Sequence, residues 1–230
     1  TNGDQLTGSF IRVIGDKVYL YLLLTMGLGP IVVDESSMEV GDTPLTDFAG
    51  VEYQLKLSPS DPMPTLFPES ASEDEGPGQI DAEDDWVQRT TSSLECAEIE
   101  VEILHPEGLI RYKKDGSRDG QDLRYRIRYR KTGTTPWLRW ADDVADDNGT
   151  LIEQLNKAIA EPFRDTYTKT VARGQYDIAV KRIAAASDGN PSVKTIINWT
   201  RLRSFKNVPP VLDTNQTLWA IKVEAGDQLN

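Results

Sequence analysis

Apolar and charged residues alternate strictly in two segments of the chain, 97–103 and 123–130. A period of two residues is typical of a β-strand that buries one face and leaves the other in water. The outward positions are all glutamates in the first segment and all arginines in the second. We therefore predict two half-buried strands with outer charge ladders of opposite sign: Glu98, Glu100 and Glu102 on one, and Arg124, Arg126, Arg128 and Arg130 on the other.

Other short apolar runs are separated by Gly, Asp and Pro, which is the pattern of strands joined by tight turns. These runs predict strands at 10–14, 18–25, 31–33, 38–40 and 50–57, and further strands at 176–183, 195–199 and 217–225. Turn residues stand at 15–16, 41–42, 105–108 and 113–120. The chain is thus predicted to be mainly β.

One segment has helical spacing instead. Its apolar residues recur at intervals of one, three and four: Leu151, Ile152, Leu155 and Ile159. Thr150 and Glu153 have the spacing of a capping box, and Pro162 follows the last apolar residue. This pattern predicts a helix near residues 150–160, so the expected class is mainly β with one or two helices.

The composition changes between residues 58 and 85, where five prolines and many carboxylates occur and no basic residue stands between Lys56 and Arg89. Such a stretch buries too little apolar surface to order itself. We predict an acidic, proline-rich loop or linker over 58–90, followed by a second β module over 91–208.

The balance of charge narrows the possible partners. Asp and Glu outnumber Lys and Arg by 37 to 25, a net charge of −12, which repels phosphate backbones and anionic membrane surfaces. The longest apolar run, 18–24, is far shorter than the roughly 20 residues of a membrane helix. We expect neither nucleic-acid recognition nor membrane insertion. The start at Thr1 and the polar ending 226–230 are expected of a piece of a longer chain.

The residue types that carry chemistry are sparse. Cys96 is the only cysteine, so no internal disulfide is possible, and a free thiol is expected of a protein made in reducing cytosol. His105 is the only histidine and lies in a turn sequence without a nucleophile motif. The aspartates at 142–143 and 146–147 lack the alternate spacing of a calcium loop. We predict no catalytic residue, no metal site and no cofactor; a hydrolase that uses Asp84 and Asp85 is the enzyme alternative.

The two ladders allow two interpretations. If their strands are neighbours, the glutamates and arginines pair across the sheet and stabilise it internally. If the strands lie in different sheets, the arginines form a docking surface for an acidic partner, because guanidinium groups bind carboxylates in a bidentate geometry.

Several blocks, taken in order along the chain, resemble the hub region of the host-specificity protein J of lambda-like siphophages. They are 19–24, Gly29-Pro30-Ile31, 41–45, 48–52, Arg89-Thr90-Thr91, 105–109, Gly116-Ser117, 124–131, 162–167, 174–182, Trp199-Thr200, Leu202, 218–225 and 227–230. None of these motifs is catalytic, and it is their shared order that carries the resemblance. The segment 58–85 is the part least similar to the family.

The resemblance implies a structural virion component at the tail tip, assembled in the host cytoplasm. In this family a trimeric hub closes the distal end of the tail tube, carries receptor-binding elements further along the chain, and opens for genome ejection. The implied partners are other tail-tip proteins and copies of the chain itself. The implied organisation places 1–57 and 209–230 in one hub module, with 91–208 as a β-sandwich inserted into it.

A rival interpretation is a surface adhesion module. The segment 176–183 together with Trp199 is similar to fibronectin-like sandwiches, which bind glycans or proteins. This alternative predicts a self-contained sandwich without a role in a virion.

Overall fold

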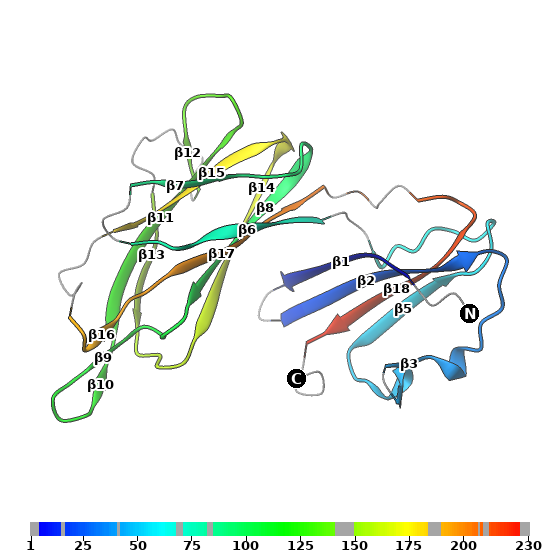
Figure 1. Cartoon of the computed structure of the whole chain (residues 1–230), viewed down its shortest axis with the longest axis horizontal. Coiled ribbons are helices and arrows are strands. Elements are labelled where there is room, and N and C mark those ends of the chain that lie inside the picture. The colour runs from blue at the N-terminus through cyan, green and yellow to red at the C-terminus, as the bar shows by residue number, and fades with distance from the viewer. Residues whose placement is uncertain are drawn as a thin grey trace. The chain divides into compact units, whose positions relative to one another are not determined.

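In a computed structural model the chain divides into two compact units, residues 1–71 with 207–230, and residues 72–206 (Figure 1). The structure describes residues 5–14, 17–40, 42–67, 71–81, 85–140, 150–183, 190–206, 208 and 212–225.

The first unit is built on an antiparallel sheet of four strands. In spatial order these are β1 (Gln5–Ile14), β2 (Lys17–Leu28), β18 (Gln216–Glu224) and β5 (Val51–Lys56). β18 comes from the far end of the sequence and pairs along its length with both β2 and β5 (Figure 1). Trp219, for example, lies opposite Leu24 and Leu55. The beginning and the end of the chain therefore share one sheet.

One face of this sheet packs against the segment between β2 and β5. That segment holds η1 (Glu35–Ser37), β3 (Glu39–Val40), β4 (Thr43–Pro44) and η2 (Leu45–Asp47). Its buried Met38 and Leu45 form a cluster with Trp219, Ile221 and Val223 of β18. The strand predicted at 31–33 is wrong, because these residues form no ladder and the Val32 side chain is 99% exposed.

The second unit consists of two packed sheets and a small third one. The first sheet has the order β14 (Phe163–Gly174), β8 (Cys96–His105), β17 (Asn198–Phe205), β6 (Ala71–Gln79). The second has the order β12 (Leu138–Arg139), β11 (Gln121–Lys131), β15 (Tyr176–Ile183), β7 (Val87–Thr90), with β13 (Thr150–Lys157) also paired to β11. The third joins β10 (Arg118–Asp119), β9 (Ile110–Tyr112) and β16 (Val193–Lys194).

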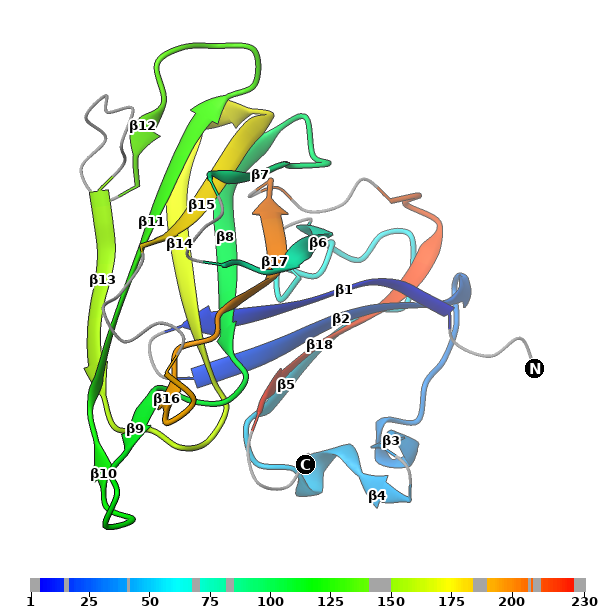
Figure 2. The same cartoon turned by 60° about the vertical axis from the view of Figure 1, so that its left-hand side comes forward.

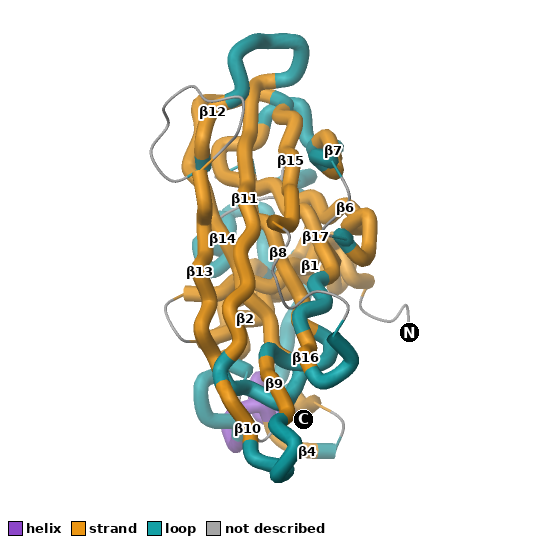
Figure 3. Tube along the Cα trace, turned by 90° about the vertical axis from the view of Figure 1, so that its left-hand side faces the viewer, coloured by secondary structure: helices purple, strands orange, loops and turns teal. Residues whose placement is uncertain are grey.

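The two larger sheets face each other, as Figures 2 and 3 show, with β13, β11 and β15 in one layer and β14, β8 and β17 in the other. The alternating apolar positions supply the core between them. Ile99, Val101 and Ile103 of β8 are fully buried against residues of β11 and β15, as the period of two predicts. The predicted sandwich-like, mainly β class is confirmed.

The predicted helix at 150–160 is wrong. Residues 150–157 form β13, which pairs antiparallel with β11 from Gln121↔Lys157 to Ile127↔Thr150. Pairing with β13 satisfies the backbone groups on the edge of β11 away from β15, and this tertiary gain outweighs a local helical preference of a few tenths of a kcal/mol per residue. Helices in the described residues are limited to η1 and η2, and neither is long enough to span a membrane. The aspartates at 142–143 and 146–147 lie outside the described residues.

The predicted acidic linker is wrong in two places. Residues 71–79 form β6 and residues 87–90 form β7, and both are edge strands of the sandwich. β6 is ordered by backbone pairing and ion pairs rather than by apolar burial. Its backbone runs so close to β17 that a side chain at Gly76 would collide with the carbonyl group of Trp199. The strand predicted at 195–199 is also shifted, since β17 runs from Asn198 to Phe205.

Candidate interaction surface

The two charge ladders lie in different sheets. β8 carries the glutamates and has β14 and β17 as neighbours, whereas β11 carries the arginines and has β15, β12 and β13 as neighbours. The glutamates and arginines of the two ladders therefore do not pair across one sheet, and each ladder has partners of its own.

The glutamate ladder is largely buried, which corrects the expectation of an exposed face. Glu100 is 0% exposed and forms an ion pair with Arg203, which lies directly opposite it on β17. Glu102 is 7% exposed; its carboxylate lies 3.5 Å from Arg203 Nη2 and accepts a hydrogen bond of 2.7 Å from Thr200. Glu98 is half-buried.

β6 completes this network from the edge of the sheet. Arg203 Nε donates to Glu73 at 2.8 Å, and Arg201 Nε lies 3.5 Å from the same carboxylate. Burial disfavours the charge of Arg203, but the hydrogen bonds that it donates to Glu73 and Glu100 outweigh burial and raise the pKa of the guanidinium. The glutamate ladder thus stabilises the sandwich internally. Arg201 and Arg203 stand two residues apart in the sequence, which places both on one face of a strand. This spacing could have predicted the partners of the glutamate ladder.

The arginine ladder has a different environment, because tryptophans stack on it. The guanidinium carbon of Arg128 lies 3.9 Å from the ring centroid of Trp86 and 4.5 Å from that of Trp137. The guanidinium carbon of Arg130 lies 4.4 Å from the Trp137 centroid, and its Nε donates to Asp177 at 2.9 Å. Stacking holds the planar guanidinium groups in place.

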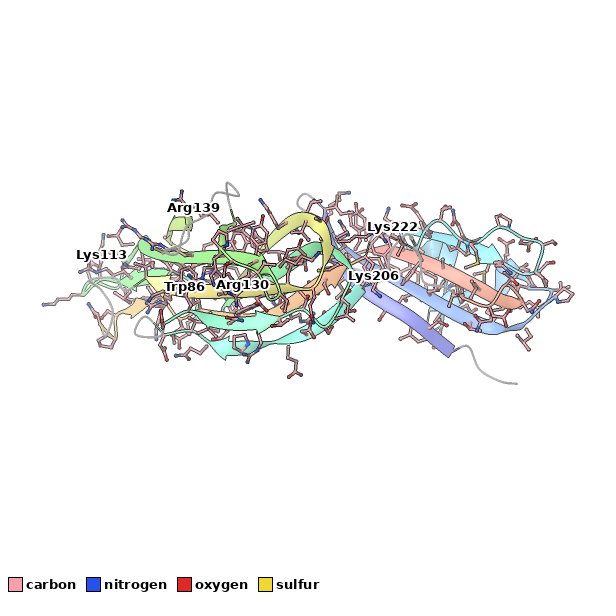
Figure 4. All side chains as sticks on the ribbon, turned by 90° about the horizontal axis from the view of Figure 1, so that it is seen from above. Trp86, Lys113, Arg130, Arg139, Lys206 and Lys222 are labelled. Atoms are coloured by element: carbon pink, nitrogen blue, oxygen red, sulfur yellow. The ribbon has the colours of Figure 1, made fainter. Side chains whose placement is uncertain are left out.

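Neighbouring strands add further cations to the same face. Arg139 of β12 lies opposite Arg128, and Lys181 of β15 lies opposite Arg126, so their side chains leave the sheet on the same side. Lys181 forms an ion pair of 3.0 Å with the exposed Asp85, and its hydrogen bond lowers the pKa of that carboxyl. We call this set the arginine face; it consists of Arg124, Arg126, Arg128, Arg130, Arg139, Lys181, Trp86 and Trp137. Figure 4 shows Trp86, Arg130 and Arg139 among the side chains of this unit.

The tryptophans of the arginine face were missed by sequence reasoning. Trp86 follows the proline-rich stretch 58–85 and Trp137 lies outside the regular strands, so neither falls on a periodic pattern. Chemically, the face offers stacked guanidinium groups at intervals of two residues, about 7 Å along the strand. Such groups bind carboxylates or phosphates in a bidentate geometry.

We expect Trp137→Ala to lower the free energy of unfolding of the sandwich by about 1 kcal/mol, because it removes the ring shared by Arg128 and Arg130. Urea denaturation measures this change. The control Arg124→Ala alters an exposed side chain of the same face and should stay within about 0.5 kcal/mol. Equal effects of the two variants would contradict the stacking argument.

The other candidate residues have structural surroundings. His105 is fully buried, stacks on Phe163 at 4.2 Å between ring centroids, and has its Nε2 3.1 Å from Asp165. The Cys96 thiol is also fully buried and donates to the Gly174 carbonyl at 2.8 Å, and burial raises its pKa. Within the described ranges, no group of three or more His, Cys, Asp or Glu side chains is arranged to hold a metal ion.

The sandwich corresponds to a known protein family. A family model described as the FNIII-A domain of tip attachment protein J matches residues 72–208, which is more than half of the chain and coincides closely with the second unit. A comparison with curated proteins finds no match. The described fold, with two antiparallel sheets packed face to face, fits a fibronectin type III domain. The chain therefore belongs to the tip attachment protein J family and is a structural component of the phage tail tip.

Proposed function

We propose that this chain is part of the hub that closes the distal end of the tail tube and links the tube to receptor-binding elements during adsorption and genome ejection. The observation that carries the proposal is the match of residues 72–208 to a domain of tip attachment protein J. The resemblance of the flanking segments to the hub of the same family extends it to the first unit.

The order of elements supports a role in assembly. The sandwich occupies the sequence between β5 and β18, and these two strands pair with each other in the first unit. A domain inserted in this way is connected to its host module through both of its ends. We infer that the first unit, built from 1–57 and the returning strand of 209–230, is the hub module, and that the sandwich is carried by it.

Partners and place of assembly follow from the same proposal. The chain would contact other tail-tip proteins and further copies of itself, as a trimer, in the virion. The buried Cys96 thiol suits assembly in the reducing host cytoplasm. The role is structural rather than enzymatic, and the buried surroundings of His105 and Cys96 support a packing role for both.

Electron microscopy of the virion tests the proposal. Antibodies raised against residues 72–206 should label the distal end of the tail of a phage that carries this gene, and deletion of the gene should yield particles without a closed tip. An antibody against the major tail-tube protein is the control, since it labels the whole tube. Labelling along the tube, on lateral fibres only, or nowhere on the virion would refute the hub assignment.

A second candidate function is a surface adhesion module that binds glycan or protein. The fibronectin-type sandwich and its half-buried cationic and aromatic face favour it. It predicts that the purified chain binds components of a glycan array and that binding is lost in Trp137→Ala. Labelling of the tail tip without any glycan binding would decide against it.

A further inference from the structure

The negative charge of the chain is concentrated in one of its units. Residues 1–71 and 207–230 carry 13 Asp and Glu against 4 Lys and Arg, a net charge of −9. Residues 72–206 carry 24 against 21, a net charge of −3. The arginine face therefore belongs to a nearly balanced domain, whereas the other unit is strongly acidic.

The acidity of the first unit has a local centre. No Lys or Arg occurs between Lys17 and Lys56. This stretch carries six exposed carboxylates, which we call the acidic segment: Asp34, Glu35, Glu39, Asp42, Asp47 and Glu52. Val32, the most exposed large apolar side chain among the described residues, lies two residues before the first of them. The segment thus offers carboxylates and an apolar side chain on one polypeptide stretch.

Part of the acidic segment is held in place by local hydrogen bonds. The Asp34 carboxylate accepts from the Ser36 amide at 3.0 Å, and Tyr53 Oη donates to Glu35 at 2.8 Å. Met38 and Leu45 anchor the same stretch to the sheet beneath. An ordered, anchored segment loses less conformational entropy on binding than a disordered one.

The arginine face is complementary to this segment in charge and in chemistry. Its cations stand two residues apart on β11 and extend to β12 and β15, so the face is broad enough to meet several carboxylates at once. Trp86 and Trp137 supply apolar surface between the guanidinium groups, where an aliphatic side chain such as Val32 can pack. Arg and Trp are the residue types enriched at the energetic centres of protein interfaces.

We propose that the arginine face binds the acidic segment of a second copy of this chain, an inference that rests on the proposed role in the tail hub. Because the two surfaces belong to different units, the contact is head-to-tail: each copy offers its arginine face to one neighbour and its acidic segment to the other. Such a contact closes into a ring when the rotation between copies permits it. A copy suits the face better than nucleic acid, since the chain as a whole carries a charge of −12.

Sedimentation velocity of the 230-residue chain tests the contact. The wild type should self-associate at concentrations up to about 1 mM and low ionic strength, and association should weaken as salt screens the charges. The double variant Arg124→Glu with Arg139→Glu replaces two cations of the arginine face by carboxylates and keeps Arg128 and Arg130, which stack on Trp86 and Trp137. The double variant Glu39→Lys with Asp42→Lys replaces two of the six carboxylates by cations and keeps Asp34 and Glu35. Each alone should associate about tenfold more weakly or worse.

Mixing the two variants distinguishes contact between copies from a general effect of charge. In the mixture, every contact between unlike copies again joins opposite charges, so the mixture should associate more strongly than either variant alone. A ring of three keeps at least one contact between like copies, so association should recover only in part. Circular dichroism and thermal unfolding check that both variants fold. If a variant does not fold, the salt dependence of wild-type association still tests whether the contact is electrostatic.

Three results would overturn the proposal: a monomeric wild type at about 1 mM, variants that associate as the wild type does, or a mixture that stays dissociated. Binding of an anionic oligosaccharide that Arg124→Glu with Arg139→Glu abolishes, without self-association of the wild type, would assign the face to a glycan instead. Labelling of the tail tip is independent of these results. A tip-labelled virion with a monomeric chain leaves the hub assignment intact and removes only the contact between copies.

Discussion

Replacement of Glu100 by alanine is expected to lower the free energy of unfolding of the sandwich by about 3–5 kcal/mol. Glu100 is fully buried, and its ion-pair partner Arg203 is 2% exposed. Removal of the carboxylate leaves a buried guanidinium with one fewer acceptor, and the desolvation of that charge is then poorly compensated. The effect is large because both partners are buried; an exposed pair such as Lys17 and Glu224 is worth at most about 1 kcal/mol.

Urea denaturation followed by tryptophan fluorescence measures this change, because four of the five tryptophans belong to the sandwich: Trp86, Trp137, Trp140 and Trp199. Glu75→Ala, an exposed position on β6, is the matched control and should stay within about 0.5 kcal/mol. Glu100→Gln keeps an oxygen that can accept from Arg203 and should be less destabilised than Glu100→Ala. A loss below about 1 kcal/mol for Glu100→Ala would show that the pair is not buried as described.

The ion pair between Glu100 and Arg203 shows which part of the fold the sequence could predict and which part it could not. The period of two in 97–103 and 123–130 correctly predicted the strands and the apolar face that each buries. It could not predict what lies on the opposite face, because a polar face is solvent-exposed or paired depending on which strand is the neighbour. β8 lies beside β17, whose Arg201 and Arg203 pair with its glutamates. β11 lies beside β15, which places a single carboxylate, Asp177, opposite the arginine ladder, where it pairs with Arg130.

Residues 71–79 and 150–157 were mispredicted for a related reason. Local composition favoured a loop in one case and a helix in the other, yet each segment forms an edge strand of a sheet. Edge strands gain backbone hydrogen bonds from a neighbour that is distant in sequence, and no local pattern records that neighbour. The arginine face was predicted as a row of charges, but its tryptophans come from outside β11, so the stacking became visible only in three dimensions.

Trp199→Ala is expected to destabilise the sandwich by about 3–5 kcal/mol, through loss of packing rather than loss of charge. Trp199 is fully buried and belongs to the core cluster formed by β8, β11 and β15. Its Nε1 donates to the Arg201 carbonyl at 2.9 Å, across the position where the register between β17 and β8 shifts by one residue. The indole therefore fills the core and also satisfies a backbone acceptor at an irregular point of the strand.

Two variants separate these contributions. Trp199→Phe keeps most of the buried ring and loses the hydrogen bond, so we expect a loss of about 1–3 kcal/mol, between the wild type and Trp199→Ala. Trp137→Ala removes an indole of the same size from the half-buried arginine face and should cost only about 1 kcal/mol. Urea denaturation followed by circular dichroism measures the free energy of unfolding of all three variants. This signal does not depend on the fluorescence of the tryptophans that are replaced. If Trp199→Ala proved no more damaging than Trp137→Ala, Trp199 would not fill the core of the sandwich. If Trp199→Phe matched Trp199→Ala, the hydrogen bond to Arg201 would outweigh the packing, and the register shift in β17 would be the feature that the indole maintains.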